Sequence, residues 1–180
     1  MPLTEADVQS ALREVVDPNT GKDLVAGKSL KRARVDGAAV SVDVELGYPA
    51  RSQIAPMREK VAERLRALPG VGEVTVNVYQ KIVAHSVQRG VKLLPNVKNI
   101  IAVASAKGGV GKSTTAANLA LALSAEGASV GMLDADIYGP SQPTMLGITG
   151  RPSTKDNRTI EPMEGHGIQA SSIGFMIDLD

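Results

Sequence analysis

The chain has 180 residues, a net charge of +1, three tyrosines, one phenylalanine and no tryptophan. This length suits one medium domain or two small ones, and the near-neutral charge excludes a global field that would steer the chain to nucleic acid or anionic lipid. There is no apolar run of membrane-spanning length, and the first residues lack the pattern of a signal peptide. The absence of cysteine excludes disulfides and is compatible with a cytoplasmic location.

The chain opens with the pattern of a capped helix. Residues 4–16 carry apolar side chains at helical spacing. Thr4 is the predicted N-cap, and Asp7 stands three residues later where a capping box commonly has glutamate. Residues 17–21, Asp-Pro-Asn-Thr-Gly, have the composition of a turn.

The next segments predict a small α+β layer domain over residues 1–84. Residues 38–46 alternate as a half-exposed strand, and residues 73–78 predict another strand. Between them, residues 54–68 carry an apolar stripe at helical spacing, with Pro56 near the first turn. A basic cluster precedes these elements and is interpreted as a solvated face, since no aromatic side chain is interleaved with it; it consists of Lys28, Lys31, Arg32 and Arg34.

Residues 85–98 contain Gly90 and Pro95 among mixed polar and apolar residues, which predicts a linker. The second predicted domain therefore covers residues 99–180. Within it, residues 148–165 are rich in glycine, proline, threonine and aspartate and predict an exposed loop.

An octapeptide, Lys-Gly-Gly-Val-Gly-Lys-Ser-Thr, follows the apolar run 99–105 and precedes a helical pattern. A strand, a glycine-rich loop and a helix form the context of a phosphate-binding P-loop. Its glycines let backbone N–H groups point at an anion, and the helix start adds partial positive charge. Lys112 is expected to reach the β- and γ-phosphates of ATP, and the Ser113 hydroxyl to bind Mg²⁺. The expected nucleotide-binding residues are Lys107, Gly108, Gly109, Val110, Gly111, Lys112, Ser113 and Thr114.

Two features depart from the simple P-loop pattern. Ala106 stands where that pattern begins with glycine, which is tolerable if its φ is negative. Lys107 is an additional lysine at the start of the loop, and taken alone it reads as a surface residue.

Two carboxylates follow the next predicted strand, residues 129–133. Asp134 and Asp136 are two positions apart, so they are expected to leave the strand on the same side and to face the P-loop at the carboxyl edge of a parallel sheet. Asp134 is placed to hold Mg²⁺, through water, and Asp136 to orient the water that attacks the γ-phosphate. In isolation, both would read as aspartates of a solvated turn.

Residues 107–114 resemble the deviant Walker A motif of the MinD/ParA/Mrp class of ATPases. The continuation Asp-Ala-Asp-Ile-Tyr-Gly-Pro-Ser at 134–141 resembles more closely the Mrp/ApbC family of iron–sulfur cluster carrier ATPases. The resemblance implies a doubly wound, mostly parallel P-loop NTPase sheet and a homodimer. It also implies that Lys107 crosses the dimer interface to the partner's nucleotide and joins Lys112 and Asp136 in catalysis.

The resemblance extends to the first domain, whose Asp-Pro-x-Thr-Gly, Leu-Gly-Tyr-Pro-Ala and Leu-Pro-Gly-Val segments look like the iron–sulfur-assembly domain of many Mrp proteins. Free-standing relatives often carry a reactive cysteine after the second strand, and residues 46–50 have none. This domain is therefore expected to be a docking or structural module. The implied partners are apo iron–sulfur proteins and cluster-assembly proteins, with no nucleic acid and no membrane.

An iron–sulfur carrier needs thiolate ligands, and the family supplies them from a Cys-x-x-Cys pair far toward the C-terminus. The family's Walker B segment is also missing, and a sheet that stops after about three strands would leave an apolar edge, so we expect a fragment of a protein about twice as long. The cofactors expected are ATP and Mg²⁺, with an iron–sulfur cluster in the longer parent. Two alternatives stay open, a ParA/MinD-type positioning ATPase and a non-catalytic nucleotide-binding scaffold.

Overall fold

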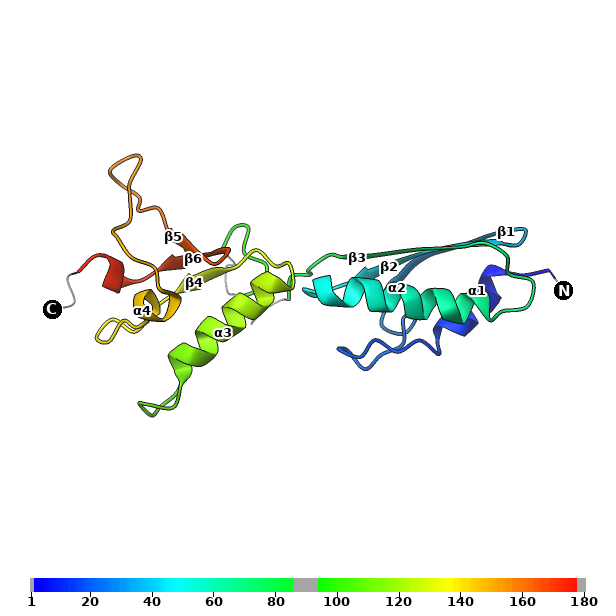
Figure 1. The fold of residues 1–180 in the computed structure, drawn as a ribbon, viewed down its shortest axis with the longest axis horizontal. Helices are drawn as coiled ribbons and strands as arrows, with labels where there is room; N and C mark the ends of the chain where they lie inside the picture. Colours follow the sequence, from blue (N-terminus) through cyan, green and yellow to red (C-terminus); the bar gives the residue numbers. More distant parts are fainter. Residues whose placement is uncertain (1, 86–93, 178–180) are drawn as a thin grey trace. The chain divides into compact units, whose positions relative to one another are not determined.

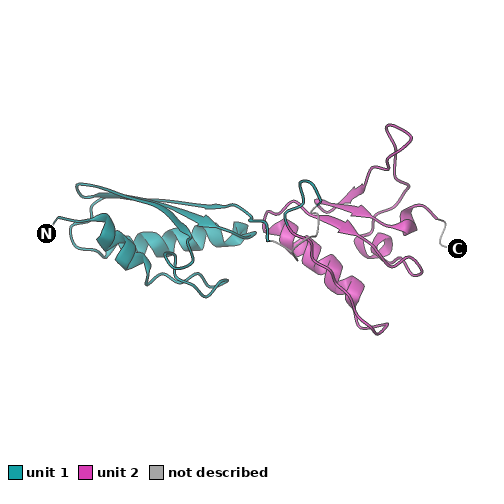
Figure 2. Ribbon diagram, turned by 180° about the vertical axis from the view of Figure 1, so that it is seen from behind, with its two compact units in different colours: residues 1–98 teal, residues 99–180 magenta. Residues whose placement is uncertain are grey.

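A computed structural model describes residues 2–85 and 94–177 and divides the chain into two compact units, Met1–Lys98 and Asn99–Asp180 (Figures 1 and 2). The predicted linker, residues 85–98, falls at the end of the first unit. Its central part, residues 86–93, lies outside the described residues.

The first unit is a three-stranded sheet with two helices. In chain order its elements are α1 (Glu5–Leu12), β1 (Leu30–Asp36), β2 (Ala39–Leu46), α2 (Arg51–Arg66) and β3 (Val74–Gln80). The strand order is β1-β2-β3, with β1 antiparallel to β2 and β2 parallel to β3. Helix α2 makes the crossover between the two parallel strands and lies along one face of the sheet (Figure 1).

The start of α1 confirms the predicted cap. The Thr4 backbone N–H donates to Asp7 Oδ2 at 2.9 Å, and the Asp7 N–H donates to Thr4 Oγ1 at 3.3 Å, which completes a capping box. The helix ends at Leu12, earlier than predicted. The chain bends there because Val15 accepts a backbone hydrogen bond from Leu24 and Val16 forms a bridge with Asp23.

Helix α2 begins at Arg51, so Pro56 lies inside the helix rather than near its first turn. Proline removes one backbone donor from a helix interior. The apolar stripe of Met57, Val61 and Leu65, all buried in the core of this unit, offsets that loss by packing.

Strand β1 was not predicted from the sequence. Its basic residues alternate with Ala33 and Val35, which pack against the core. Lys31 forms an ion pair of 3.1 Å with Glu45 on the neighbouring strand. Part of the basic cluster therefore lies on the solvent-facing side of β1, while the apolar residues of this strand are half-buried.

The core of the first unit is aliphatic, as the shortage of aromatic residues suggests. On β2 every second residue is buried, which confirms the predicted alternation. The buried core residues are Val8, Leu12, Val15, Leu24, Val40, Val42, Val44, Leu46, Ala50, Met57, Val61, Leu65 and Val78.

A buried carboxylate connects the loop that follows α1 with the segment that precedes α2. Asp17 is fully buried, and its Oδ1 accepts hydrogen bonds from the Asn19 backbone N–H at 2.9 Å and the Tyr48 hydroxyl at 2.8 Å. Its Oδ2 is buried without a protein donor. The two segments are 31 residues apart in sequence, so this contact fixes the loop after α1 against the segment that enters α2.

The second unit contains α3 (Lys112–Ala125), β4 (Gly131–Leu133), α4 (Gln142–Leu146), β5 (Met163–Gly165), β6 (Ile168–Ser171) and a short 3₁₀ turn, Ile173–Phe175. The strand order is β4-β6-β5, with β4 parallel to β6 and β5 antiparallel to β6. The core of this unit is smaller and gathers where α3, α4 and β6 meet; its buried residues are Ala117, Ala120, Leu146, Ile168, Ala170 and Phe175.

Helix α3 ends as its sequence predicts. Gly127 has a φ of 89° and donates its N–H to Ser124, while the Ala128 N–H donates to Leu123. These two bonds form a Schellman motif, which needs a residue in the left-handed region and favours glycine.

The predicted strand at residues 99–105 is wrong for the described structure. The segment pairs with no strand among the described residues, and Ile100 and Ile101 are 60% and 59% exposed. An apolar run indicates a buried strand only when a neighbouring strand supplies its hydrogen-bond partners. The unit is α/β, and the doubly wound parallel sheet is not observed in it.

We predict that Tyr48→Phe destabilises the first unit by about 1–3 kcal/mol, because a buried carboxylate loses one of its two donors. Urea denaturation followed by circular dichroism measures the free energy of unfolding. Tyr138→Phe is the matched control, since that ring is fully exposed. An unchanged midpoint for Tyr48→Phe would show that the bond to Asp17 contributes nothing.

The same variant carries a pH signature. Burial, and then the hydrogen bond to Asp17, raise the pKa of Tyr48 from 10.0 to about 12. The folded state therefore holds this proton more tightly, so the contribution is complete below pH 10 and is lost as the pH rises from 10 to about 12. Over that window the stability difference between the wild type and Tyr48→Phe is expected to shrink.

Candidate functional site

The glycine-rich loop before α3 has the backbone conformation that glycine favours. Gly109 and Gly111 have φ values of 72° and 87°, and Gly111 is the N-cap of α3 without a side-chain cap. No atom lies within 4 Å of the place where a Cβ would stand on either glycine. The left-handed backbone, rather than crowding, therefore selects glycine here, and the loop leaves the first N–H groups of α3 open to an anion.

The remaining loop residues are placed by local bonds. Ser105 Oγ contacts both the N–H and the carbonyl of Lys107 at 3.1 Å, which forms a tight turn at the start of the loop. Ala106 does not have a positive φ, so alanine is compatible with this position. Lys107 is exposed, whereas Lys112 and Ser113 are half-buried as the first two residues of α3.

Asp134 lies at the centre of a hydrogen-bond network where β4 ends. Its side chain is 8% exposed. Its Oδ2 accepts from the Ser172 hydroxyl at 3.0 Å and from the Gln142 N–H at 3.2 Å, and its Oδ1 accepts from the Asp136 N–H at 3.2 Å. Its own N–H donates to the carbonyl of Ser171 on the neighbouring strand at 2.9 Å. These bonds compensate the lost hydration of a buried carboxyl group.

The expectation that both carboxylates face the P-loop stays a prediction, but Asp136 has a different environment from Asp134. It is exposed, and its Oδ1 accepts from the Gly139 N–H at 3.2 Å within its own turn. Strand β4 ends at Leu133, so neither aspartate lies within the strand whose alternation the prediction assumed.

Gln142 brings Asp134 close to the loop. Its N–H donates to Asp134, and its side-chain Nε2 donates to the backbone carbonyl of Ser113 at 3.3 Å. One residue thus bridges the two positions that the sequence assigns to Mg²⁺. Asp136 is joined to this bridge through its backbone N–H, which donates to Asp134 Oδ1.

Sequence reasoning missed both Gln142 and Ser172. Ser172 follows β6 and is 38 residues from Asp134, so no local pattern indicates their contact. Gln142 follows the Gly-Pro-Ser segment directly, and a buried glutamine has no periodic signature. The contacts of both residues with Asp134 are apparent only in the three-dimensional structure, in which β6 pairs with β4.

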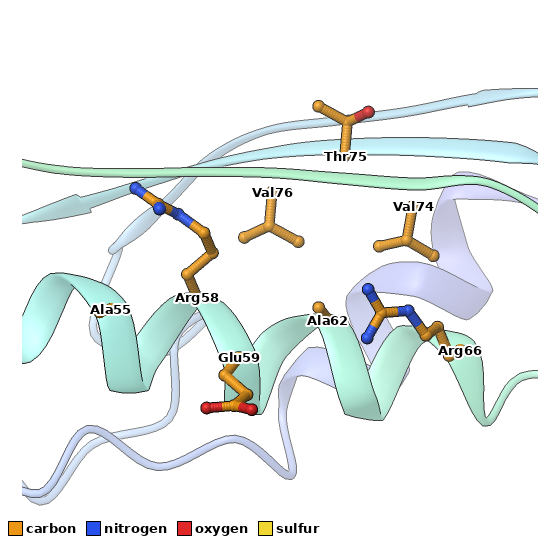
Figure 3. Close-up of a pocket in the computed structure, with 8 residues that line it drawn as sticks. All are labelled: Ala55, Arg58, Glu59, Ala62, Arg66, Val74, Thr75 and Val76. Carbon is orange, nitrogen blue, oxygen red and sulfur yellow. The ribbon is translucent and has the colours of Figure 1, made fainter.

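Other parts of the described chain contain fewer features that indicate a functional site. A groove of about 510 Å³ lies in the first unit between α2 and β3, where Arg58 and Arg66 flank Val74 and Val76 (Figure 3). Across residues 2–85 and 94–177, no three His, Cys, Asp or Glu side chains gather as they would around a metal ion. None of the helices described has the length and apolar character needed to cross a membrane.

Comparison with known proteins gives a match for each unit. Residues 96–180 match the family model described as the NUBPL iron-transfer P-loop NTPase. Residues 5–78 match the family described as an iron–sulfur cluster assembly protein. The chain thus combines a P-loop NTPase segment with an iron–sulfur assembly domain.

Curated relatives match nearly the whole chain. An iron–sulfur cluster carrier protein of Synechocystis is 43% identical over 99% of this chain and 52% of its own length. The carrier protein of Escherichia coli K12 is 38% identical over 97% of this chain and 48% of its own length. The chloroplastic Fe–S cluster assembly factor HCF101 of Arabidopsis thaliana is 40% identical over 96% of this chain and 33% of its own length.

The chain spans about half the length of most of the curated relatives it matches. Both family models and these relatives agree that the chain is similar to iron–sulfur cluster carrier proteins that contain a P-loop NTPase segment. The resemblance inferred from its motifs is confirmed.

We predict that Ser172→Ala destabilises the second unit by about 1–3 kcal/mol, because the buried carboxylate of Asp134 loses a donor. Thermal unfolding monitored by circular dichroism measures the change. Ser129→Ala, an exposed serine just before β4, is the control and should stay within about 0.5 kcal/mol of the wild type. Equal behaviour of the two variants would remove Ser172 from the network.

Proposed function

We propose that this chain is the nucleotide-binding part of an iron–sulfur cluster carrier that binds and hydrolyses ATP. The observation that carries the proposal is the bridge through Gln142, which holds Asp134 beside the first turn of α3. A carboxylate and a serine at the start of a P-loop helix are the groups that hold Mg²⁺ in P-loop NTPases. The family and the curated relatives support the same function.

ATP would bind with its phosphates on residues 107–114. The N–H groups that follow Gly109 and Gly111 supply donors, and Lys112 supplies the positive charge. Mg²⁺ would be held by the Ser113 hydroxyl and, through water, by Asp134, and it would neutralise charge on the phosphates. A buried amide oxygen of Gln142 without a protein donor fits a hydrated ion beside it.

Hydrolysis would require Asp136 to orient the attacking water and Lys107 to act on the nucleotide of a second copy. Asp136 is exposed in a turn that its own side chain closes, so it can reorganise without disturbing the core. Lys107 is exposed and bonds to Ser105 through its backbone, so its side chain suits a contact across a homodimer. Binding and hydrolysis of ATP would then rearrange the dimer and control cluster transfer.

The iron–sulfur cluster would be cargo rather than a resident group of this chain. The chain has no cysteine, and thiolates are the ligands such clusters need, so the cluster would bind to other residues of a longer protein. The first unit would dock apo iron–sulfur proteins or cluster-assembly proteins. A cytoplasmic location stays a prediction.

Lys112→Ala is expected to reduce ATP affinity by at least about a hundredfold, because the phosphates lose their main cation in a partly desolvated site. Isothermal titration calorimetry with Mg²⁺ present measures this change. Lys155→Ala is the control, since Lys155 is an exposed lysine of the same unit paired with Glu161. Undiminished affinity in Lys112→Ala would contradict the P-loop assignment.

The role of Lys107 across a dimer is tested by mixing inactive variants of the longer protein. Lys107→Ala and Asp136→Ala should each suppress hydrolysis, with a barrier increase on the order of a few kcal/mol. If each site takes Asp136 from one subunit and Lys107 from the other, a mixed dimer has one site with both residues intact. Mixing should therefore restore part of the activity. Mixtures that stay inactive despite subunit exchange would refute the trans role.

A further inference from the structure

Gln142 lies at the start of a helix but is buried, unlike a glutamine on the protein surface. It is the first residue of α4 and is 4% exposed. Its N–H donates to Asp134 Oδ2 at 3.2 Å, and its Nε2 donates to the Ser113 carbonyl at 3.3 Å. Both donor groups of this residue are thus directed at the two residues assigned above to Mg²⁺.

The acceptor of the same amide has no such partner. Gln142 Oε1 is buried and accepts no hydrogen bond from the described residues, and the neighbouring Ser141 Oγ is in the same condition. An unsatisfied buried polar atom costs about 1–3 kcal/mol. Such atoms are rare in folded proteins, and an ion or ordered water commonly explains them. The amide therefore lies ready for a donor that the polypeptide itself does not supply.

We propose that Gln142 senses the metal–nucleotide complex: its Oε1 accepts a hydrogen bond from water bound to Mg²⁺ between Ser113 and Asp134. The inference rests on the proposed function, which places Mg²⁺ there. A neutral amide oxygen is a suitable acceptor because Mg²⁺ in proteins usually keeps several of its waters, and their hydrogens are strong donors. Gln142 is then a positioning residue that acts through the metal's waters.

Metal binding is coupled through this residue to the turn that carries Asp136. Gln142 directly follows residues 135–141, and its N–H and side chain anchor the end of this segment to Asp134 and to α3. A metal-bound water that completes the hydrogen bonding of Gln142 would strengthen the anchor. The anchor reports the presence of Mg²⁺ and not only of nucleotide, because bare nucleotide brings no metal-bound water.

The test separates the metal from the nucleotide. Gln142→Met keeps the length of the side chain and removes both polar atoms, and Gln169→Met, at an exposed glutamine on β6, is the matched control. Calorimetry measures the ATP dissociation constant with Mg²⁺ and with EDTA. In Gln142→Met the loss of affinity in EDTA should be smaller than the loss with Mg²⁺, so that the gain on adding Mg²⁺ falls about tenfold. The control should keep the full gain.

An equal loss of affinity in both conditions would overturn the inference, because it would make Gln142 a purely structural brace. An unchanged Mg²⁺ gain would overturn it as well. A wild type that binds no ATP in either condition would refute the proposed function itself, so the two failures are distinguishable.

A second variant keeps the test decisive if Gln142→Met folds poorly. Gln142→Glu retains an acceptor oxygen but loses the donor to Ser113. It should therefore preserve at least the wild-type gain in affinity on adding Mg²⁺, although it binds ATP alone more weakly because of its added negative charge. A Gln142→Glu variant without any Mg²⁺ gain would contradict the role of the acceptor.

Discussion

The buried carboxylate of Asp134 determines how the second unit is assembled. It accepts hydrogen bonds from Ser172 after β6, from the first residue of α4 and from the turn after β4, and its own N–H completes the pairing of β4 with β6. A buried carboxylate is tolerated only when several donors compensate its lost hydration. The same requirement places α4, and Gln142 with it, against the first turn of α3.

The hydrogen bonds of Asp134 explain how a unit with a small core can hold the residues of the candidate site in place. The second unit buries few side chains, and several large apolar residues stay exposed, among them Ile100, Leu133 and Ile137. The geometry around the P-loop therefore depends less on packing than on the bonds of Asp134, Gln142 and Ser172. The first unit differs, since its aliphatic core is larger and its buried Asp17 joins two loops of the same unit.

Local features were predictable from the sequence because their causes are local. The capping box of Thr4 and Asp7, the Schellman end at Gly127 and the left-handed glycines before Lys112 each depend on residues within a few positions. Strand pairing was less predictable, since it depends on distant segments. The basic residues of β1 obscured its strand pattern, and the apolar run at 99–105 predicted a strand that does not pair with another strand among the described residues.

The same distinction between local and distant contacts applies to the candidate site. The octapeptide and Asp134 were predicted from the sequence pattern, whereas Gln142 and Ser172 contribute through contacts that span 29 and 38 residues. The different burial of Asp134 and Asp136, which both follow the end of β4, is also something that alternation alone does not determine. What the sequence could not provide is the network that connects the loop to the carboxylate.

Hydrogen exchange of the 180-residue chain, with ATP and Mg²⁺ against ATP and EDTA, tests the central claim most directly. The account predicts that ATP slows exchange of the N–H groups in residues 107–115 under both conditions. It further predicts that protection of residues 134–142 appears only with Mg²⁺, and that β1, β2 and β3 stay unchanged. Protection centred on the first unit, or none in residues 107–115, would contradict the claim that this loop and the Asp134 network form one nucleotide site.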